Sequence, residues 1–195
     1  MYNIYVMIIG ICGKFGSGKS YIAQHLSKET GIPIFHFDKF IVKKLMRPGI
    51  KQVAQWKLGK KLSLGYGHLL SNLGSLERTL RWYEKMMILR WGNKALRKLM
   101  KKGDPVIIDF FGLPISKHFD RFAYKVLVVS DDGERKMRLI ERNGFTTEQA
   151  SNIDKVAADI VDYSEHKFDY VIENDYISLP PAVRDLEALL VKDVS

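Results

Sequence analysis

Apolar runs alternate with amphipathic segments along the chain, which indicates strands separated by helices. Strands are predicted where short runs are rich in Ile, Val and Phe, at 5–11, 32–37, 106–109, 125–129 and 170–172. Helices are predicted where apolar residues recur every three or four positions, at 20–28, 39–47, 75–101, 131–143, 146–165 and 181–191. This order predicts an α/β fold with a parallel sheet flanked by helices and a helical insertion.

The first apolar run leads into a glycine-rich segment. Gly13-x-x-x-x-Gly18-Lys19-Ser20 fits the phosphate-binding loop pattern G-x-x-x-x-G-K-[ST]. Its glycines let backbone N–H groups point into one concavity, Lys19 would reach the β- and γ-phosphates, and Ser20 would bind Mg²⁺. We expect a P-loop NTPase-type fold that binds a nucleotide. The nucleotide contacts are assigned to Gly13, Lys14, Phe15, Gly16, Ser17, Gly18, Lys19, Ser20 and Tyr21.

Positive charge is concentrated in one part of the chain. The whole sequence of 195 residues has a net charge of +9. Residues 39–103 contain 17 Lys and Arg against 2 Asp and Glu, a charge of +15, so the remainder carries −6. We predict a single domain with its core at about 1–38 and 104–195 and a basic, helical, acceptor-binding insertion at about 39–103. Such a charge attracts an anionic small molecule or a nucleic acid, and composition leaves both open.

Three tryptophans lie in this insertion, at Trp56, Trp82 and Trp91. Aromatic residues at helical spacing are usually part of the core, and we predict that role. One or two of them could instead line a pocket for a purine or an apolar arm of a ligand.

Composition also bears on where the protein works. The hydrophobic content of 46% is enough for one good core, and no run reaches the length of a membrane span. The single cysteine, Cys12, excludes an intramolecular disulfide and fits a reducing compartment. We interpret it as a small buried core residue. The apolar start lacks the basic region and cleavage site of a signal peptide. We therefore expect a cytoplasmic protein that does not bind membranes. We also expect it to be a monomer.

Two carboxylates follow predicted strands. Asp38 comes at the end of 32–37, where it could serve catalysis or cap the next helix. Its position alone favours neither interpretation. Asp109 ends the strand at 106–109 in the manner of a Walker B carboxylate, which holds Mg²⁺ directly or through water. We therefore assign the metal to Ser20 and Asp109.

Arg138 and Arg142 lie four residues apart and so share one face of the helix at 131–143. Arginine stabilises the charge that spreads over a phosphoryl group during transfer, and both side chains could serve that role. The alternative is that both arginines pair with nearby acids on a solvated surface. The sequence leaves these two interpretations open.

Several blocks together resemble the dephospho-CoA kinase family. They are the loop at 13–20, His36-Phe-Asp38 where the family has D-x-D, the R-L-x-x-R pattern at 138–142, Thr-x-Glu-x-Ala at 146–150, and Asp169-Tyr-Val-Ile-Glu-Asn174. These blocks cover both ends of the chain, and the middle third matches poorly.

The resemblance implies ATP-dependent phosphorylation of the ribose 3′-hydroxyl of dephospho-CoA, the final step of coenzyme A biosynthesis. It implies that Asp38, Lys19 and Arg142 are catalytic residues. It also implies that Arg142 and Arg138 belong to a lid at about 131–147 that closes over the phosphates, and that Asn174 lies near the adenine.

The chain departs from the family mainly where the acceptor would bind. His36 replaces the first acid of D-x-D, Tyr21 replaces the threonine after the loop serine, and 112–116 lacks a family glutamate. Two alternatives therefore remain. One is a P-loop nucleoside or nucleotide kinase with a different acceptor. The other is a nucleic-acid-associated nucleotide-binding protein, although the insertion lacks a recognisable nucleic-acid-binding pattern.

Overall fold

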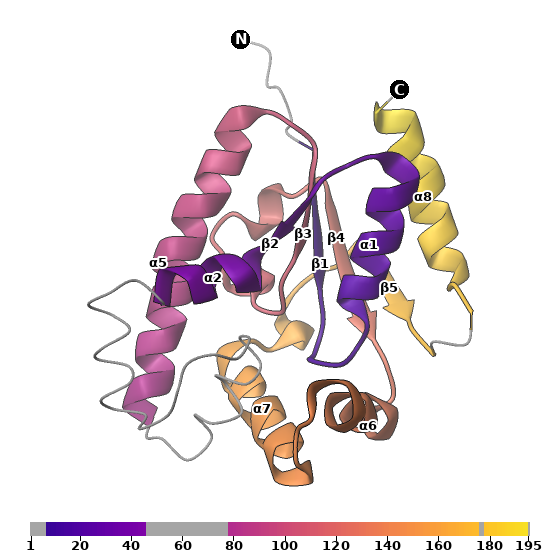
Figure 1. Cartoon of the computed structure of the whole chain (residues 1–195). Coiled ribbons are helices and arrows are strands. Elements are labelled where there is room, and N and C mark those ends of the chain that lie inside the picture. Colours follow the sequence, from indigo (N-terminus) through magenta and orange to yellow (C-terminus); the bar gives the residue numbers. More distant parts are fainter. Residues whose placement is uncertain (1–6, 46–77, 176–177, 195) are drawn as a thin grey trace.

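The computed structural model describes residues 7–45, 78–175 and 178–194 (Figure 1). Trp56 and about half of the predicted insertion, residues 46–77, lie outside these ranges. The side chain of Trp82 is not described either. None of the helices in the described ranges is long and apolar enough to cross a membrane.

A parallel sheet forms the centre of the described structure (Figure 1). Its order is β2-β3-β1-β4-β5, and every neighbouring pair is parallel. The strands are β1 (Ile8–Cys12), β2 (Ile34–His36), β3 (Val106–Asp109), β4 (Tyr124–Val129) and β5 (Tyr170–Glu173). The predicted α/β fold with a parallel sheet is confirmed. The carboxyl ends of the strands meet at one edge, where α/β proteins bind their ligands.

Helices cover both faces of this sheet. They are α1 (Lys19–Thr30), α2 (Phe37–Leu45), α5 (Arg78–Lys102), α6 (Asp132–Asn143), α7 (Thr147–Ile160) and α8 (Pro181–Val194). Helices α1 and α8 lie together on one face, and α5 lies on the other (Figure 1). Helices α6 and α7 pack against each other beside the carboxyl end of β1 (Figure 1).

The side chains of β1 alternate between two apolar cores. Ile9 and Ile11 belong to the core under α1 and α8, whereas Ile8 and Cys12 belong to the core under α5 and α7. All four are 0% exposed, as expected for a central parallel strand buried on both faces. Each fully buried isoleucine stabilises the fold by about 1.5–3 kcal/mol. Cys12 is a buried core residue, as predicted.

The predicted boundary between β2 and α2 is wrong, and this changes the place of Asp38 in the fold. Strand β2 ends at His36, and Phe37 begins α2, whereas the sequence predicted a strand over 32–37. Asp38 therefore lies in the first turn of a helix, and it is neither a strand-end residue nor the residue that precedes the helix. The ring of Phe37 is buried against Phe110, with ring centroids 4.7 Å apart, so the first residue of α2 is part of the core.

Side-chain caps fix the start of the next two helices. Asp131 caps α6 through the N–H groups of the first turn, and Thr146 forms a reciprocal capping box with Gln149 at the start of α7. Helix α7 ends at Ile160, so the helix predicted at 146–165 is too long.

Candidate nucleotide-binding and catalytic site

The phosphate-binding loop, residues 13–18, joins β1 to α1 at the carboxyl edge of the sheet (Figure 1). Other parts of the chain approach it so closely that side chains would not fit. A Cβ on Gly13 would clash with the carbonyl oxygen of Val128, and one on Gly16 would lie 2.6 Å from the carbonyl oxygen of Arg135. Gly16 also has a φ of 78°, in the left-handed region that suits glycine. The loop is thus pressed between β4 and α6.

Ser20 and Asp109, the predicted metal pair, are in direct contact. Ser20 Oγ donates a hydrogen bond of 2.5 Å to Asp109 Oδ2, which joins the first turn of α1 to the end of β3. Asp109 is 6% exposed, and its Oδ1 accepts no hydrogen bond from the described residues. Hydroxyl and carboxylate oxygens are ligands that Mg²⁺ prefers. A buried carboxylate oxygen without a donor fits a site that a cation completes.

Charged groups from several elements act on Asp109. Burial raises the pKa of Asp109, while the charge of Lys19 and the hydrogen bond from Ser20 lower it. The charge of Asp38 raises this pKa by a smaller amount, and His36 lowers it. His36 pairs with Asp109 in the register of β2 and β3. The acid of α2, the loop lysine and the metal pair therefore lie at the same edge of the sheet.

Asp38 is half-buried at the start of α2. Its Oδ1 accepts a hydrogen bond of 2.7 Å from the backbone N–H of Lys39. A carboxylate in this place can accept the proton of an alcohol that approaches the loop.

Lys19 lies beside an aromatic ring of the loop itself. Its Nζ is 5.1 Å from the centroid of the Phe15 ring, which in turn packs on Phe111 at 4.8 Å. The neighbouring Lys14 is exposed and pairs with Asp132 of α6 at 3.3 Å. The side chain of Lys19 therefore lies against a pair of packed aromatic rings, whereas that of Lys14 is exposed to solvent.

Three successive carbonyl groups of the loop accept hydrogen bonds from side chains later in the chain. The pairs are Phe15 O with Arg135 Nη1 at 2.7 Å, Gly16 O with Arg138 Nη1 at 3.4 Å, and Ser17 O with Asn174 Nδ2 at 2.9 Å. Two residues predicted to contact nucleotide, Arg138 and Asn174, thus contact the loop backbone. Arg138 also pairs with Glu134 at 2.6 Å, in line with the ion-pair alternative.

Sequence reasoning did not assign Arg135. Its role depends on Asp154, which is on a different helix, so its own position in the sequence gives little signal. The available hint was an arginine one turn before Arg138 on the same helix. Arg142 is exposed in the last turn of α6, and Tyr21 is 51% exposed on α1.

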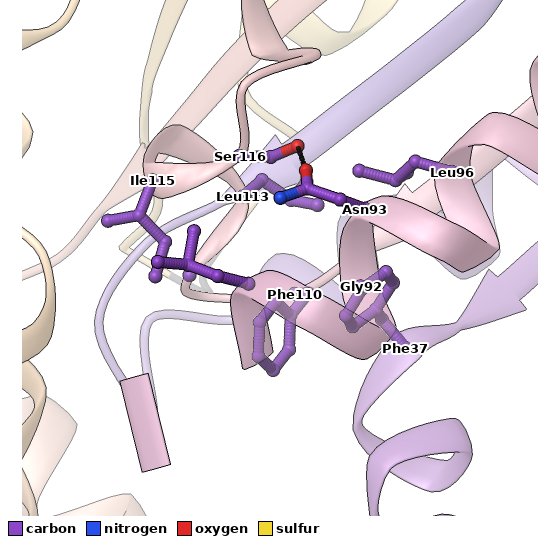
Figure 2. Close-up of a pocket in the computed structure, with 10 residues that line it drawn as sticks. Phe37, Gly92, Asn93, Leu96, Phe110, Leu113, Ile115 and Ser116 are labelled. Carbon is purple, nitrogen blue, oxygen red and sulfur yellow. Dashed lines mark hydrogen bonds between the residues drawn. The ribbon is translucent and has the colours of Figure 1, made fainter. Parts of the chain in front are cut away.

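Figure 2 shows a small pocket between α2, α5 and the turn after β3. Phe37, Gly92 and Phe110 line it, and Ser116 Oγ donates a hydrogen bond of 2.7 Å to Asn93 Oδ1 at its rim. The volume of this pocket is about 10 Å³, which is room for one water molecule at most. Phe37 of α2 packs on Gly92 of α5 at this pocket. The pocket therefore marks the contact between α5 and the helix that carries Asp38.

A larger groove of about 620 Å³ lies between β2, α2 and α5. Aromatic rings and lysines line it, and none of the described residues that line it is acidic. These lysines make the electrostatic potential positive where they line the groove. Trp91 packs on the core, as predicted, and also lines this groove. The rings are those of Phe35, Phe40 and Trp91, and the lysines are Lys44, Lys94, Lys98 and Lys102.

The sequence that includes the phosphate-binding loop matches a known sequence family. The profile of a family described as AAA domain matches residues 9–159. The chain belongs to the AAA domain family. This match runs from the loop through the metal pair and the arginine-bearing helix, so it includes most of the site.

The chain is also similar to curated proteins and to solved structures. A dephospho-CoA kinase of Fusobacterium nucleatum subsp. nucleatum is 29% identical over 188 residues, covering 87% of this chain and 90% of that protein. A dephospho-CoA kinase of Shouchella clausii is 28% identical over 192 residues, with the same shares. The structure of TT1252 from Thermus thermophilus is 20% identical, covers 95% of this chain and 97% of that chain, and has a TM-score of 0.62. Shikimate kinase from Bacteroides thetaiotaomicron is 15% identical, covers 94% and 98%, and has a TM-score of 0.56.

The two structures show the fold alone, and the relatives bear on activity. The predicted resemblance to dephospho-CoA kinases is confirmed. So is the prediction that this AAA domain protein is an ATP-dependent P-loop kinase.

Proposed function

We propose that this kinase transfers the γ-phosphoryl group of ATP to the ribose 3′-hydroxyl of dephospho-CoA. The observation that carries the proposal is the alignment with two proteins named dephospho-CoA kinase over 87% of this chain and 90% of each relative. An alignment of that extent cannot omit the whole insertion at 39–103. The similarity therefore reaches the part of the chain that we predict to bind the acceptor.

The loop and its neighbours would hold the phosphates of ATP. The backbone at 13–18 and Lys19 contact the phosphate oxygens in this proposal, at the positive end of α1. Ser20 and Asp109 would hold Mg²⁺, which would supply positive charge beside the phosphates of ATP.

Asp38 would act on the acceptor. It accepts the proton of the 3′-hydroxyl as that oxygen forms its bond to the γ-phosphorus. The bond from the γ-phosphorus to the bridging oxygen breaks, and its electron pair leaves with ADP. Lys19 stabilises the charge on the moving group, and we retain Arg142 as a further cation that reaches it.

The groove between β2, α2 and α5 would hold the rest of the acceptor. Dephospho-CoA carries an anionic pyrophosphate and an adenine ring, which complement lysines and aromatic side chains respectively. Helix α2 carries Asp38 in its first turn and Phe40 and Lys44 further along. In this proposal the hydroxyl of the acceptor lies at Asp38, and the rest of the acceptor passes around α2 to Phe40 and Lys44, which lie on another face of that helix. Lys94 and Lys98, four residues apart on α5, form its basic wall.

The reaction itself tests the proposal. The purified chain is incubated with ATP, Mg²⁺ and dephospho-CoA, and the product is identified by mass spectrometry, with phosphorus NMR to distinguish the 3′- from the 2′-position. We expect 3′-phosphorylated product from wild type and none from Lys19→Ala. Turnover of a nucleoside, a nucleotide, shikimate or gluconate without turnover of dephospho-CoA would reject this acceptor and leave the P-loop kinase assignment intact.

A further inference from the structure

Arg135 of α6 is the bulkiest fully buried side chain among the described residues, with 1% of its side chain exposed. A buried guanidinium is tolerated only when it is paired and hydrogen-bonded. Its two terminal nitrogens form a two-pronged contact with Asp154 of α7, at 2.7 and 2.6 Å. It also contacts Asp132, with Nη2 at 3.0 Å and Nε at 3.3 Å from Oδ1. The planar fork matches the carboxylate of Asp154, so the guanidinium has one fixed orientation.

One donor of this fixed group also reaches the phosphate-binding loop. Nη1 donates a hydrogen bond of 2.7 Å to the carbonyl oxygen of Phe15. A trans peptide group is planar, so the carbonyl of Phe15 and the N–H of Gly16 point in opposite directions. A carbonyl held toward Arg135 therefore directs the next N–H away from Arg135.

The same logic applies to the next two peptide groups of the loop. Arg138 contacts the carbonyl of Gly16, and Asn174 contacts the carbonyl of Ser17. Arg135 differs from these two because its contact is the shortest and because a second helix holds its guanidinium. The backbone of Arg135 also lies against Gly16, where an added Cβ would meet its carbonyl oxygen at 2.6 Å. Helix α6 is thus joined to the loop by both side chain and backbone.

We propose that Arg135 is a positioning residue of the nucleotide site. Asp154 orients the guanidinium, the guanidinium fixes the Phe15 carbonyl, and the loop amides are thereby directed before a nucleotide arrives. Donors fixed in advance need no rearrangement when phosphate binds, which raises affinity. The inference rests on the proposed ATP site, and it adds a residue that touches neither ATP nor the acceptor.

A purely structural role is the alternative, since the Arg135–Asp154 pair also joins α6 to α7. Replacing a buried ion pair by apolar residues of similar volume often preserves stability. The double variant Arg135→Met with Asp154→Leu therefore keeps the two helices packed and removes the bond to Phe15. The matched control is His25→Leu with Glu187→Leu, which replaces a part-buried pair between α1 and α8 at 3.1 Å.

The test is titration of each protein with a fluorescent ATP analogue and Mg²⁺ in the absence of acceptor, with the melting temperature measured alongside. We expect the Arg135→Met/Asp154→Leu variant to melt close to wild type and its Kd to rise about tenfold or more. The control pair should leave Kd unchanged. In turnover assays KM for ATP should rise in the first variant, while KM for the acceptor stays the same.

A folded Arg135→Met/Asp154→Leu variant with wild-type Kd would overturn the proposal. Should that variant fail to fold, Asp154→Asn keeps the side-chain shape and weakens the fork, and we expect its Kd to rise about threefold. Wild-type affinity in folded Asp154→Asn would then overturn the proposal. Wild type that does not bind the analogue would instead reject the ATP site itself, so the two failures are distinguishable.

Discussion

The hydroxyl of Ser20 and the carboxylate of Asp109 are joined by a hydrogen bond of 2.5 Å, although 89 residues separate them in the sequence. The bond connects the helix after the phosphate-binding loop to the strand next to β1. In a parallel sheet both groups reach the same edge because each follows the carboxyl end of a strand. This pair defines the place where we propose that Mg²⁺ binds.

Asp109→Asn tests that metal site. The amide keeps the size of the side chain and can still accept the hydrogen bond from Ser20, but it is a much weaker ligand for Mg²⁺. We expect the Mg²⁺ concentration for half-maximal activity to rise roughly tenfold to a hundredfold. Asp104→Asn, at an exposed position before β3, is the control and should match wild type. An unchanged Mg²⁺ dependence in Asp109→Asn would remove this residue from the metal site.

The same variant should change the pH dependence of stability without ligand. Burial, opposed in part by Lys19 and Ser20, raises the pKa of Asp109 above its ordinary value of 3.8. The folded protein therefore binds this proton more tightly than the unfolded chain does. The stability from this group is complete below pH 3.8 and is lost as pH rises through the raised folded pKa.

Thermal unfolding in Mg²⁺-free buffer at several pH values checks the sign. Asp109→Asn does not titrate, so we expect it to melt above wild type near neutral pH. The difference should shrink as the pH falls toward the ordinary pKa of aspartate. A variant that melts below wild type at neutral pH would show that the buried carboxylate stabilises the ligand-free fold.

Asp38→Asn separates chemistry from nucleotide binding. The amide cannot accept the proton of the acceptor hydroxyl, so kcat should fall by about 10²- to 10⁴-fold. The Kd for ATP, measured without acceptor, should stay within about twofold of wild type, because Asp38 is assigned to the acceptor side. Full turnover in this variant would exclude Asp38 as the catalytic carboxylate.

Lys98→Glu tests the basic groove. Reversal of one charge on its wall should raise KM for dephospho-CoA about fivefold and leave KM for ATP unchanged. The effect should weaken as salt is added, because the charge is exposed. Lys192→Glu makes the same change at an exposed position of α8, on the other face of the sheet. It should leave both KM values unchanged. Equal effects from the two substitutions would mean that net charge matters and the groove does not.

Thr146→Ala tests the cap of the helix that carries Asp154. Thr146 accepts the N–H of Gln149 at 3.1 Å, and loss of such a cap costs about 1 kcal/mol of unfolding free energy. Thr147, the first residue of α7, is exposed, and its alanine variant should lie within about 0.5 kcal/mol of wild type. Chemical denaturation of both variants measures the difference. Equal losses would argue against the capping box.

Local pattern was enough to predict the strands around the site and to select Ser20 and Asp109, which the structure brings together. Both depend on short segments, the glycine spacing of the loop and an apolar strand that ends in an acid. The start of α2 was missed because Phe37 continues the apolar run of β2 in the sequence, whereas in the structure its ring packs on Phe110 from the first turn of the helix. Propensity alone does not contain such a contact.

The hydrogen bonds to the loop carbonyls could not be predicted for a related reason. The arginine pattern on α6 drew attention to Arg138, but the spacing of the arginines does not indicate which loop atoms Arg138 contacts. The role of Arg135 depends on how α7 brings Asp154 against α6. Only the packed arrangement of three segments reveals that contact.

A competition assay tests the central claim most directly. Wild type receives limiting ATP labelled in the γ-phosphate, Mg²⁺, and equal amounts of dephospho-CoA, adenosine, a nucleoside monophosphate, shikimate and gluconate. The account predicts that the label accumulates on the 3′-oxygen of dephospho-CoA and that Asp38→Asn slows this transfer by about 10²- to 10⁴-fold. Label that accumulates on any other acceptor, while dephospho-CoA stays unmodified, would contradict it.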